Sequence, residues 1–309
     1  MAGKRIAIFI ALTFVLSWTY EFCVVWPVMS GAWGALSPAI VQMCVVAVMF
    51  VPALSVVLTR LITHEGFSNS AIMPVQFKQT WKWWVAGWFG PAVLIIAGAI
   101  FYFVVHPEDF DPTFSVLTST LTASATDAQA LSSSDVFTLV MMQVITGILL
   151  APALNLFVCF GEEWGWRGYL LPHMLEEHSI FTTLLVSGCI WGLWHAPLIM
   201  MGHNYGFGYW GFPYTGILMM CAMSMVFGTV FSFITIKSGS CLPAVFAHGS
   251  LNGVAGVGIL FSATGGSPFV GPGPMGYLGG MGFIVCALVM LYLLVDAERK
   301  GADVSLRKE

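Results

Sequence analysis

Residues 159–172, CFGEEWGWRGYLLP, place two carboxylates (Glu162 and Glu163) and one guanidinium (Arg167) in a very apolar region of the chain. Residues 136–160, which lead into this stretch, contain no charge, and the chain becomes apolar again soon after it. A charged side chain at bilayer depth costs about 2.5–3.5 kcal/mol, so such groups persist mainly where function needs them. The stretch therefore predicts a membrane-embedded chain and marks the position of its functional site.

The spacing of the three charges predicts different roles for the two carboxylates. If residues 159–171 form a helix, Glu163 and Arg167 stand at positions i and i+4, a favourable orientation for an ion pair. Glu162 lies about 100° further round the helix and is not aligned with Arg167. We therefore expect the arginine to hold Glu163, while Glu162 stays free to act as an acid or a base.

The composition is typical of an integral membrane protein. Of 309 residues, 58% are hydrophobic and only 8% are charged, and the mean hydropathy is +0.87. Soluble domains carry about 25% charged residues. The net charge of −4 on so few ionisable groups says little about partners, and no basic face suited to nucleic acid is visible. Membrane lipids are the expected surroundings, and no nucleic-acid partner is expected. The 7 cysteines form no CxxC pair, which argues against a disulfide framework or a thiolate zinc site.

Apolar segments of about 20 residues, enough to cross a bilayer, occur at 6–28, 38–60, 83–105, 136–160, 180–202, 213–236, 243–262 and 276–296. They predict an all-α polytopic membrane protein with about eight transmembrane helices. No internal repeat is visible, which argues against the inverted-repeat plan of many transporters. Residues 1–309 are expected to form a single transmembrane domain, with the functional motifs within residues 155–255.

Positive charges indicate the orientation, because Lys and Arg collect in cytoplasmic loops. If the N-terminus is inside, every Lys and Arg falls on the inner side: Lys4, Arg5, Arg60, Lys78, Lys82, Arg167, Lys237, Arg299, Lys300, Arg307 and Lys308. The loop 106–135 falls outside and carries only negative charges: Glu108, Asp109, Asp111, Asp127 and Asp135. The sequence thus predicts a multi-pass protein of the cell membrane with both termini in the cytoplasm.

Three stretches depart from simple spans. Residues 64–81 are polar enough for an inner surface loop. Residues 115–134 are rich in Ser and Thr, and their composition fits either a loop or a weak amphipathic helix. Pro152 lies within the fourth predicted span, where a proline is expected to kink the helix.

Two later spans carry histidines in helical register with a second group. His195 follows Trp191 by four residues, and Asn252 follows His248 by four, so each pair shares a helix face. Polar groups in lipid face the bundle interior and find partners there. We therefore expect these groups and the carboxylates to converge in one cavity that opens to the cytoplasm.

The ordered motifs EExxxR (Glu162, Glu163 and Arg167), aromatic-x-x-x-His (Trp191 and His195) and HxxxN (His248 and Asn252) resemble the CPBP family of intramembrane proteases. That family includes the Rce1-type CAAX prenyl endopeptidases and the bacterial Abi and bacteriocin-immunity proteins. The resemblance covers residues 155–255. Trp191 departs from the pattern, since the family usually has Phe there, and the first 130 residues carry no family motif.

The resemblance implies a role for each of these residues. Glu162 and His195 would activate a water molecule for attack on a peptide carbonyl. His248 and Asn252 would donate hydrogen bonds to the oxyanion that forms. Glu163 and Arg167 would be structural, and Asn155, two turns before Glu162, is a candidate supporting partner. The substrate would be a peptide or a lipidated protein; the oligomeric state is left open.

The same residues offer a second reading, as a metal site. Glu162, His195 and His248 provide one carboxylate and two imidazoles, a set that can bind Zn²⁺ with a water in the fourth position. Against this, the chain contains no HExxH motif, and the three groups come from three different helices. We favour a metal-free, glutamate-activated water, in which His248 lies apart from Glu162 and His195 and beside Asn252.

Two other functions remain open at this stage. A member of the same family can serve as an immunity or scaffold protein without essential proteolysis. A proton-coupled transporter would use buried carboxylates and histidines as a relay, although the polar groups here cluster toward one side. Glu21, a lone carboxylate in the first span, is expected to be an interfacial or hydrogen-bonded group.

Overall fold

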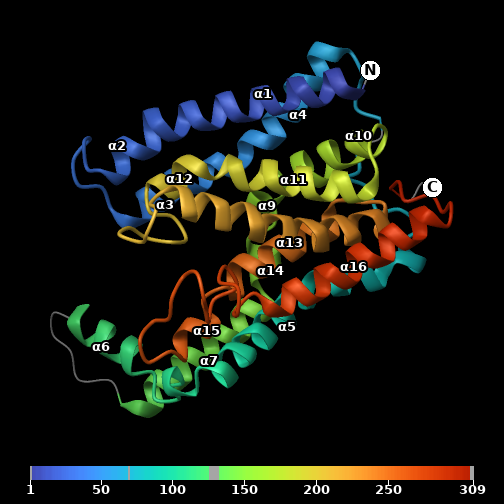
Figure 1. The fold of residues 1–309 in the computed structure, drawn as a ribbon. Coiled ribbons are helices and arrows are strands. Elements are labelled where there is room, and N and C mark those ends of the chain that lie inside the picture. Colours follow the sequence, from blue (N-terminus) through green and yellow to red (C-terminus); the bar gives the residue numbers. More distant parts are fainter. Residues whose placement is uncertain (1, 69, 125–131, 307–309) are drawn as a thin grey trace.

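The protein is a bundle of helices whose long axes run roughly side by side (Figure 1). The structure is a computed structural model that describes residues 2–68, 70–124 and 132–306. No β-strand forms in these ranges; isolated bridges such as Phe110 with Ser262 are the nearest approach to one. Asp127, Arg307 and Lys308, which entered the topology prediction, lie outside the described residues. The predicted all-α polytopic class is confirmed.

Within the described ranges, six helices are long and apolar enough to cross a membrane. The first combines α1 (Ala2–Tyr20), the π-helical η1 (Glu21–Val25) and α2 (Trp26–Met29), and the second combines α3 (Pro38–Ala47), η2 (Val48–Phe50) and α4 (Val51–Thr63). The others are α5 (Phe77–Val105), α13 (Tyr214–Ser238), α14 (Leu242–Val254) with α15 (Val257–Leu260), and α16 (Met281–Arg299). Six of the eight predicted spans therefore appear as long helices.

The fourth and fifth predicted spans are shorter and broken. The fourth runs through α7 (Ser133–Leu149), α8 (Ala151–Leu154) and α9 (Leu156–Gly165), and continues as the π-helical η4 (Trp166–Leu170) and α10 (Leu171–Leu175). The fifth is α11 (Ile180–Trp194) followed by α12 (Ala196–Met200). Pro152 lies at the first break, as expected, because proline cannot supply a backbone N–H to the helix.

Two pairs of glycines bring the site helices close to their neighbours. Gly161 and Gly165 are four residues apart on α9, and a Cβ atom at either position would collide with the second span. Gly188 and Gly192 have the same spacing on α11 and face the backbone of α13. Small residues at this spacing allow close helix packing in membranes. These contacts fix the position of the two helices that carry Glu162 and His195.

The helices are layered from α1 through α11 and α13 to α16 and α5 (Figure 1). α14 packs against α5, α8, α9 and α13, and thus occupies the interior beside the broken fourth segment. The first turn of α1 and the last turn of α16 lie at the same end of the bundle (Figure 1). This is the arrangement expected if both termini share one side of the membrane. Which side that is stays a prediction.

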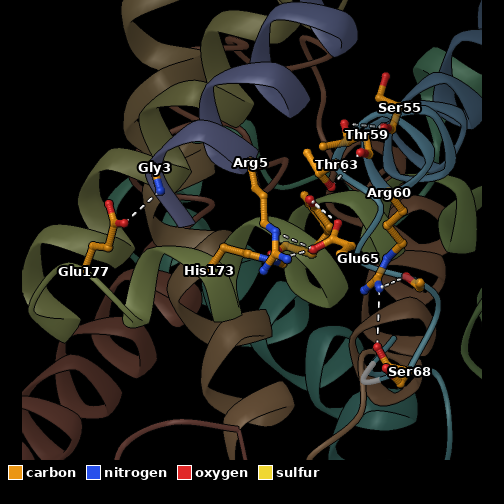
Figure 2. Close-up of polar contacts among 12 residues, drawn as sticks. Gly3, Arg5, Ser55, Thr59, Arg60, Thr63, Glu65, Ser68, His173 and Glu177 are labelled. Carbon is orange, nitrogen blue, oxygen red and sulfur yellow. Dashed lines mark hydrogen bonds and ion pairs between the residues drawn. The ribbon is translucent and has the colours of Figure 1, made fainter. Parts of the chain in front are cut away.

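A polar network joins three segments at the end of the bundle where both termini lie (Figure 2). Arg5 Nε on α1 lies 2.9 Å from Glu65 Oε2, and His173 Nε2 on α10 lies 3.4 Å from the same oxygen. The Tyr169 hydroxyl donates to the other Glu65 oxygen at 2.6 Å. The loop after α4, predicted as an inner surface loop, is therefore anchored to α1 and to the helix that follows the carboxylates.

A second polar network closes the opposite end. Asp109, in the short helix η3 (Pro107–Asp109), accepts hydrogen bonds from Ser262, Thr264 and Tyr102. Residues 115–124 form the helix α6 (Ser115–Ser124), so the helical alternative holds for the described part of that stretch.

Candidate active site

The predicted ion pair forms where the chain passes from α9 into η4. Arg167 Nη1 donates to Glu163 Oε1 at 3.0 Å, in the i, i+4 relationship expected from the sequence. Glu162, Glu163 and Arg167 are all buried. In a buried pair of this kind each charge compensates the other, so removing one partner leaves an unpaired buried charge.

His248 on α14 completes a buried triad with this pair. Its Nδ1 lies 2.9 Å from Glu163 Oε1, the oxygen that also accepts from Arg167. Because a carboxylate oxygen accepts, Nδ1 must carry the hydrogen. Nε2, on the opposite side of the ring, is left for other chemistry. Glu163 thus orients His248, for which the family resemblance implies a role in oxyanion binding. The motif spacing did not predict the contact between Glu163 and His248.

Trp191 on α11 lies at the centre of the site. Its Nε1 donates to Glu162 Oε2 at 2.8 Å, and its ring lies 4.2 Å from the Arg167 guanidinium carbon. The His248 ring contacts it edge-on at a centroid distance of 5.6 Å. The sequence marked Trp191 only as the aromatic member of a motif. The structure shows that its indole N–H is the hydrogen-bond donor to Glu162, a contact that a Phe at this position cannot make.

His195 lies at the junction between α11 and α12. Its Nδ1 is 2.8 Å from the Trp191 carbonyl oxygen. A carbonyl can only accept, so Nδ1 carries the hydrogen and the neutral ring presents an Nε2 lone pair. Glu162 and His195 therefore bind opposite ends of Trp191. The indole N–H holds the Glu162 side chain, and the backbone carbonyl fixes the tautomer of His195.

The two asparagines occupy the edge of the site. Asn155, between α8 and α9, donates its amide to the Ala151 carbonyl at 3.0 Å and to the Gly249 carbonyl at 3.4 Å. It therefore supports the backbone next to His248 and makes no hydrogen bond to Glu162. Asn252 is exposed, one turn beyond His248, and its amide points toward the Cys159 sulfur at 3.8 Å.

Residues 143–254 match the family model described as type II CAAX prenyl endopeptidase Rce1-like. This segment is Rce1-like. It includes every predicted site residue, and it confirms the resemblance inferred from the motifs. CAAX prenyl protease 2 of Methanococcus maripaludis is 41% identical over 44 residues, which are 14% of this chain and 16% of that protein. No solved structure matches the chain.

The Rce1-like segment ends with α14, and the first two spans lie outside it. Those spans nevertheless pack on the site helices, since α4 contacts α9 and η1 contacts α12. The family match supports a membrane endopeptidase, and its description specifies a CAAX prenyl enzyme rather than an immunity protein. The short aligned stretch of the relative leaves its activity and substrate as proposals for this chain.

The donor set for a metal is only partly assembled. Across the described ranges, no three His, Cys, Asp or Glu side chains come together as metal ligands. One oxygen of Glu162 is taken by Trp191, and Glu163 is taken by Arg167 and His248. The described residues therefore present no assembled set of three metal ligands, and we route no chemical step through a metal.

Glu21 differs from its expected role as an interfacial or hydrogen-bonded group. It is 0% exposed, and neither carboxyl oxygen has a hydrogen-bond partner among the described residues. No motif marked this residue, because it stands alone in an apolar span.

Proposed function

We propose that the protein is an intramembrane endopeptidase that hydrolyses a peptide bond with a glutamate-activated water. The proposal rests on the different contacts of the two adjacent carboxylates. Glu163 is neutralised by Arg167 and His248, whereas Glu162 receives one hydrogen bond, from Trp191. The match of this segment to the Rce1-like family supports the same activity.

Glu162 is proposed as the general base. Its Oε2 is fixed by Trp191, and its Oε1 accepts no hydrogen bond from the described residues. A water between Glu162 Oε1 and His195 Nε2 would give one hydrogen to each acceptor and direct its lone pair at a carbonyl carbon. Proton transfer to a positioned base of this kind contributes about 10²–10⁴-fold to rate.

His248 and Asn252 are proposed as donors to the oxyanion. His248 can donate from Nε2 when both ring nitrogens carry hydrogen, and Glu163 is placed to balance the resulting charge. Asn252 lies one turn further along α14, where its exposed amide can reach a bound substrate. A single donor of this type contributes about 2.7–4 kcal/mol to transition-state stabilisation in a comparable hydrolase.

The surface beside Asn252 suits an apolar substrate. A groove of about 350 Å³ is lined by residues of α7, α8 and α14: Met142, Gln143, Thr146, Gly147, Ala151, Leu154 and Gly253. Gly253 directly follows Asn252, so a substrate peptide bound in this groove would extend to the proposed oxyanion donors. We propose a peptide or lipidated protein as the substrate class and a site open to the cytoplasm.

Cleavage of a fluorogenic prenylated CAAX peptide by the purified protein in detergent tests the proposal. We expect turnover by the wild type and a loss of at least about 100-fold in Glu162→Gln. An immunity or scaffold role predicts no turnover with any peptide. A proton-coupled transporter predicts substrate or proton flux in proteoliposomes, and flux without peptide cleavage would overturn the proposal.

A further inference from the structure

The junction between α11 and α12 holds His195 at a break in the helix. α11 ends at Trp194, and Pro197 lies in the first turn of α12. Proline has no backbone N–H, so the Leu193 carbonyl cannot accept the usual bond from the residue four positions ahead. The His195 N–H bonds to the Gly192 carbonyl, three residues back, at 3.1 Å. Because fewer bonds within the helix hold this junction, its position depends on contacts with neighbouring helices.

The first span provides two such contacts, and both are made to Trp194. The Trp194 indole Nε1 donates to Ser17 Oγ at 2.7 Å, and the Trp18 indole Nε1 donates to the Trp194 carbonyl at 3.2 Å. Ser17 and Trp194 are 0% and 1% exposed. Two consecutive residues of α1 thus bind the side chain and the backbone of one residue. Together these bonds fix the rotation of the Trp194 ring and the position of the helix end.

Trp194 in turn contacts the His195 ring. The two rings meet edge-on at a centroid distance of 4.8 Å. On α9 and η4, Trp166 also packs edge-on against Trp194, at 5.8 Å. The hydrogen bond between His195 Nδ1 and the Trp191 carbonyl fixes the tautomer, but one bond leaves the ring free to tilt about it. The Trp194 ring restricts that tilt, and it therefore helps to determine where the Nε2 lone pair of His195 points.

We propose that Ser17 and Trp18 are positioning residues for the peptidase. They hold Trp194, and Trp194 holds the His195 ring at the angle that its Nε2 needs to bind the attacking water. This inference rests on the proposed function and adds two residues from outside the Rce1-like segment. Neither residue would touch the substrate or the reacting atoms. A displacement of about 1 Å at a catalytic group, caused by a change elsewhere, can lower the rate by about 100-fold.

The first span also carries a bond that serves as a comparison. Serine and other polar side chains join helices in membranes by hydrogen bonds that have no part in catalysis. The Tyr20 hydroxyl makes a bond between spans at 3.1 Å, to the Cys44 carbonyl of α3. The bonds of Ser17 and Trp18 differ from it because they converge on the residue that contacts His195. Loss of either kind of bond weakens packing of the first span, but only one kind should change catalysis.

Steady-state kinetics on the prenylated CAAX peptide test the catalytic part of this inference. Ser17→Ala removes the acceptor for the Trp194 indole, and Trp18→Phe removes the donor to the Trp194 carbonyl. We expect kcat to fall about tenfold to 100-fold in each variant. KM should change little, because neither residue lines the groove proposed for the substrate. Ser17→Thr keeps an acceptor oxygen and should recover most of the rate. Tyr20→Phe is the matched control and should leave kcat unchanged.

NMR spectra of the protein with isotope-labelled histidine test the geometry without reference to activity. Comparison with His195→Gln identifies the ring signal of His195. That signal should shift in Ser17→Ala and in Trp18→Phe, and it should stay in place in Tyr20→Phe. The His248 signal should stay in place in all three variants, because Glu163 holds that ring.

Wild-type kcat or an unchanged His195 signal in Trp18→Phe and Ser17→Ala would overturn the inference. Trp18 is only half-buried, so Trp18→Phe alone decides the matter where Ser17→Ala does not fold. An equal loss of kcat in Tyr20→Phe would also overturn it, because the effect would then be a general loosening of the first span. Failure of the wild type to cleave any peptide would instead overturn the proposed function, and the NMR comparison would still decide whether the first span orients His195.

Discussion

Trp191 Nε1 lies 2.8 Å from Glu162 Oε2, and this hydrogen bond joins α11 to α9 inside the bundle. The same indole ring covers the Arg167 guanidinium, and the carbonyl of the same residue accepts from His195. One residue thus positions the proposed base, the ion pair behind it and the second water-binding group. Its position follows from the close packing of α11 on α13 through Gly188 and Gly192.

Replacing Trp191 by Phe should impair catalysis more than folding. Phe keeps an aromatic ring near Arg167 but removes the donor to Glu162. We expect kcat to fall by about 10- to 150-fold, because a hydrogen bond to a charged group contributes about 1.5–3 kcal/mol. Steady-state kinetics on the prenylated peptide, with thermal unfolding in detergent measured alongside, check this expectation.

Trp164→Phe is the matched control for that experiment. Trp164 also donates an indole hydrogen bond, to the Ser70 carbonyl at 3.0 Å, but this bond lies outside the site. Equal losses of kcat in Trp164→Phe and Trp191→Phe would show that the bond to Glu162 has no special role.

Arg167→Ala should destabilise the protein strongly. It removes the guanidinium from a buried carboxylate and leaves Glu163 with His248 alone. Loss of one partner from a buried pair costs about 3–5 kcal/mol. We expect poor expression and a large drop in the midpoint of thermal unfolding in detergent. Arg167→Lys should recover part of the stability, and wild-type stability of Arg167→Ala would contradict a structural role.

Local spacing in the sequence was sufficient for part of this site. The Glu163–Arg167 pair follows from i, i+4 geometry, and the break at Pro152 follows from the chemistry of proline. The contacts of Trp191 with Glu162 and of His248 with Glu163 join residues 29 and 85 positions apart. Such contacts depend on how the helices rotate and approach, which a pattern of apolar residues does not specify.

The number of transmembrane spans was also only partly predictable from the sequence. Hydropathy alone does not distinguish a complete span from a short helix followed by a break, as at α11 and His195. The glycine pairs Gly161 with Gly165 and Gly188 with Gly192 were a usable signal, since small residues at this spacing favour close helix contact.

The Asp109 network should make the stability of the loops that it joins depend on pH. Burial alone would raise the pKa of Asp109, but hydrogen bonds from Ser262, Thr264 and Tyr102 outweigh it and hold the pKa below the ordinary value. A lowered pKa in the folded state adds stability that is present above the unfolded pKa of about 3.9 and is lost as pH falls further.

Asp109→Asn provides the measurement. The variant keeps the size of the side chain but replaces one acceptor oxygen by an amide, so it should lose about 1–3 kcal/mol at neutral pH. The difference in unfolding midpoint between wild type and Asp109→Asn should shrink as pH falls below about 4. A difference that stays constant with pH would show that the carboxylate charge does not stabilise this loop.

Metal dependence separates the two chemical schemes for the same residues. The metal-free scheme predicts that the purified protein retains its activity after prolonged chelation and dialysis, and that added Zn²⁺ gives no increase. Elemental analysis of the active protein should find zinc far below one equivalent. Activity that chelation abolishes and Zn²⁺ restores would favour the metal scheme.

The central claim, that Glu162 is the base of a peptidase, is tested most directly by one assay. Purified wild type and Glu162→Gln are compared on the prenylated CAAX peptide, with folding of both confirmed by gel filtration and thermal unfolding. The account predicts turnover by the wild type and loss of at least about 100-fold in Glu162→Gln at unchanged stability. Turnover by Glu162→Gln at the wild-type rate would contradict it.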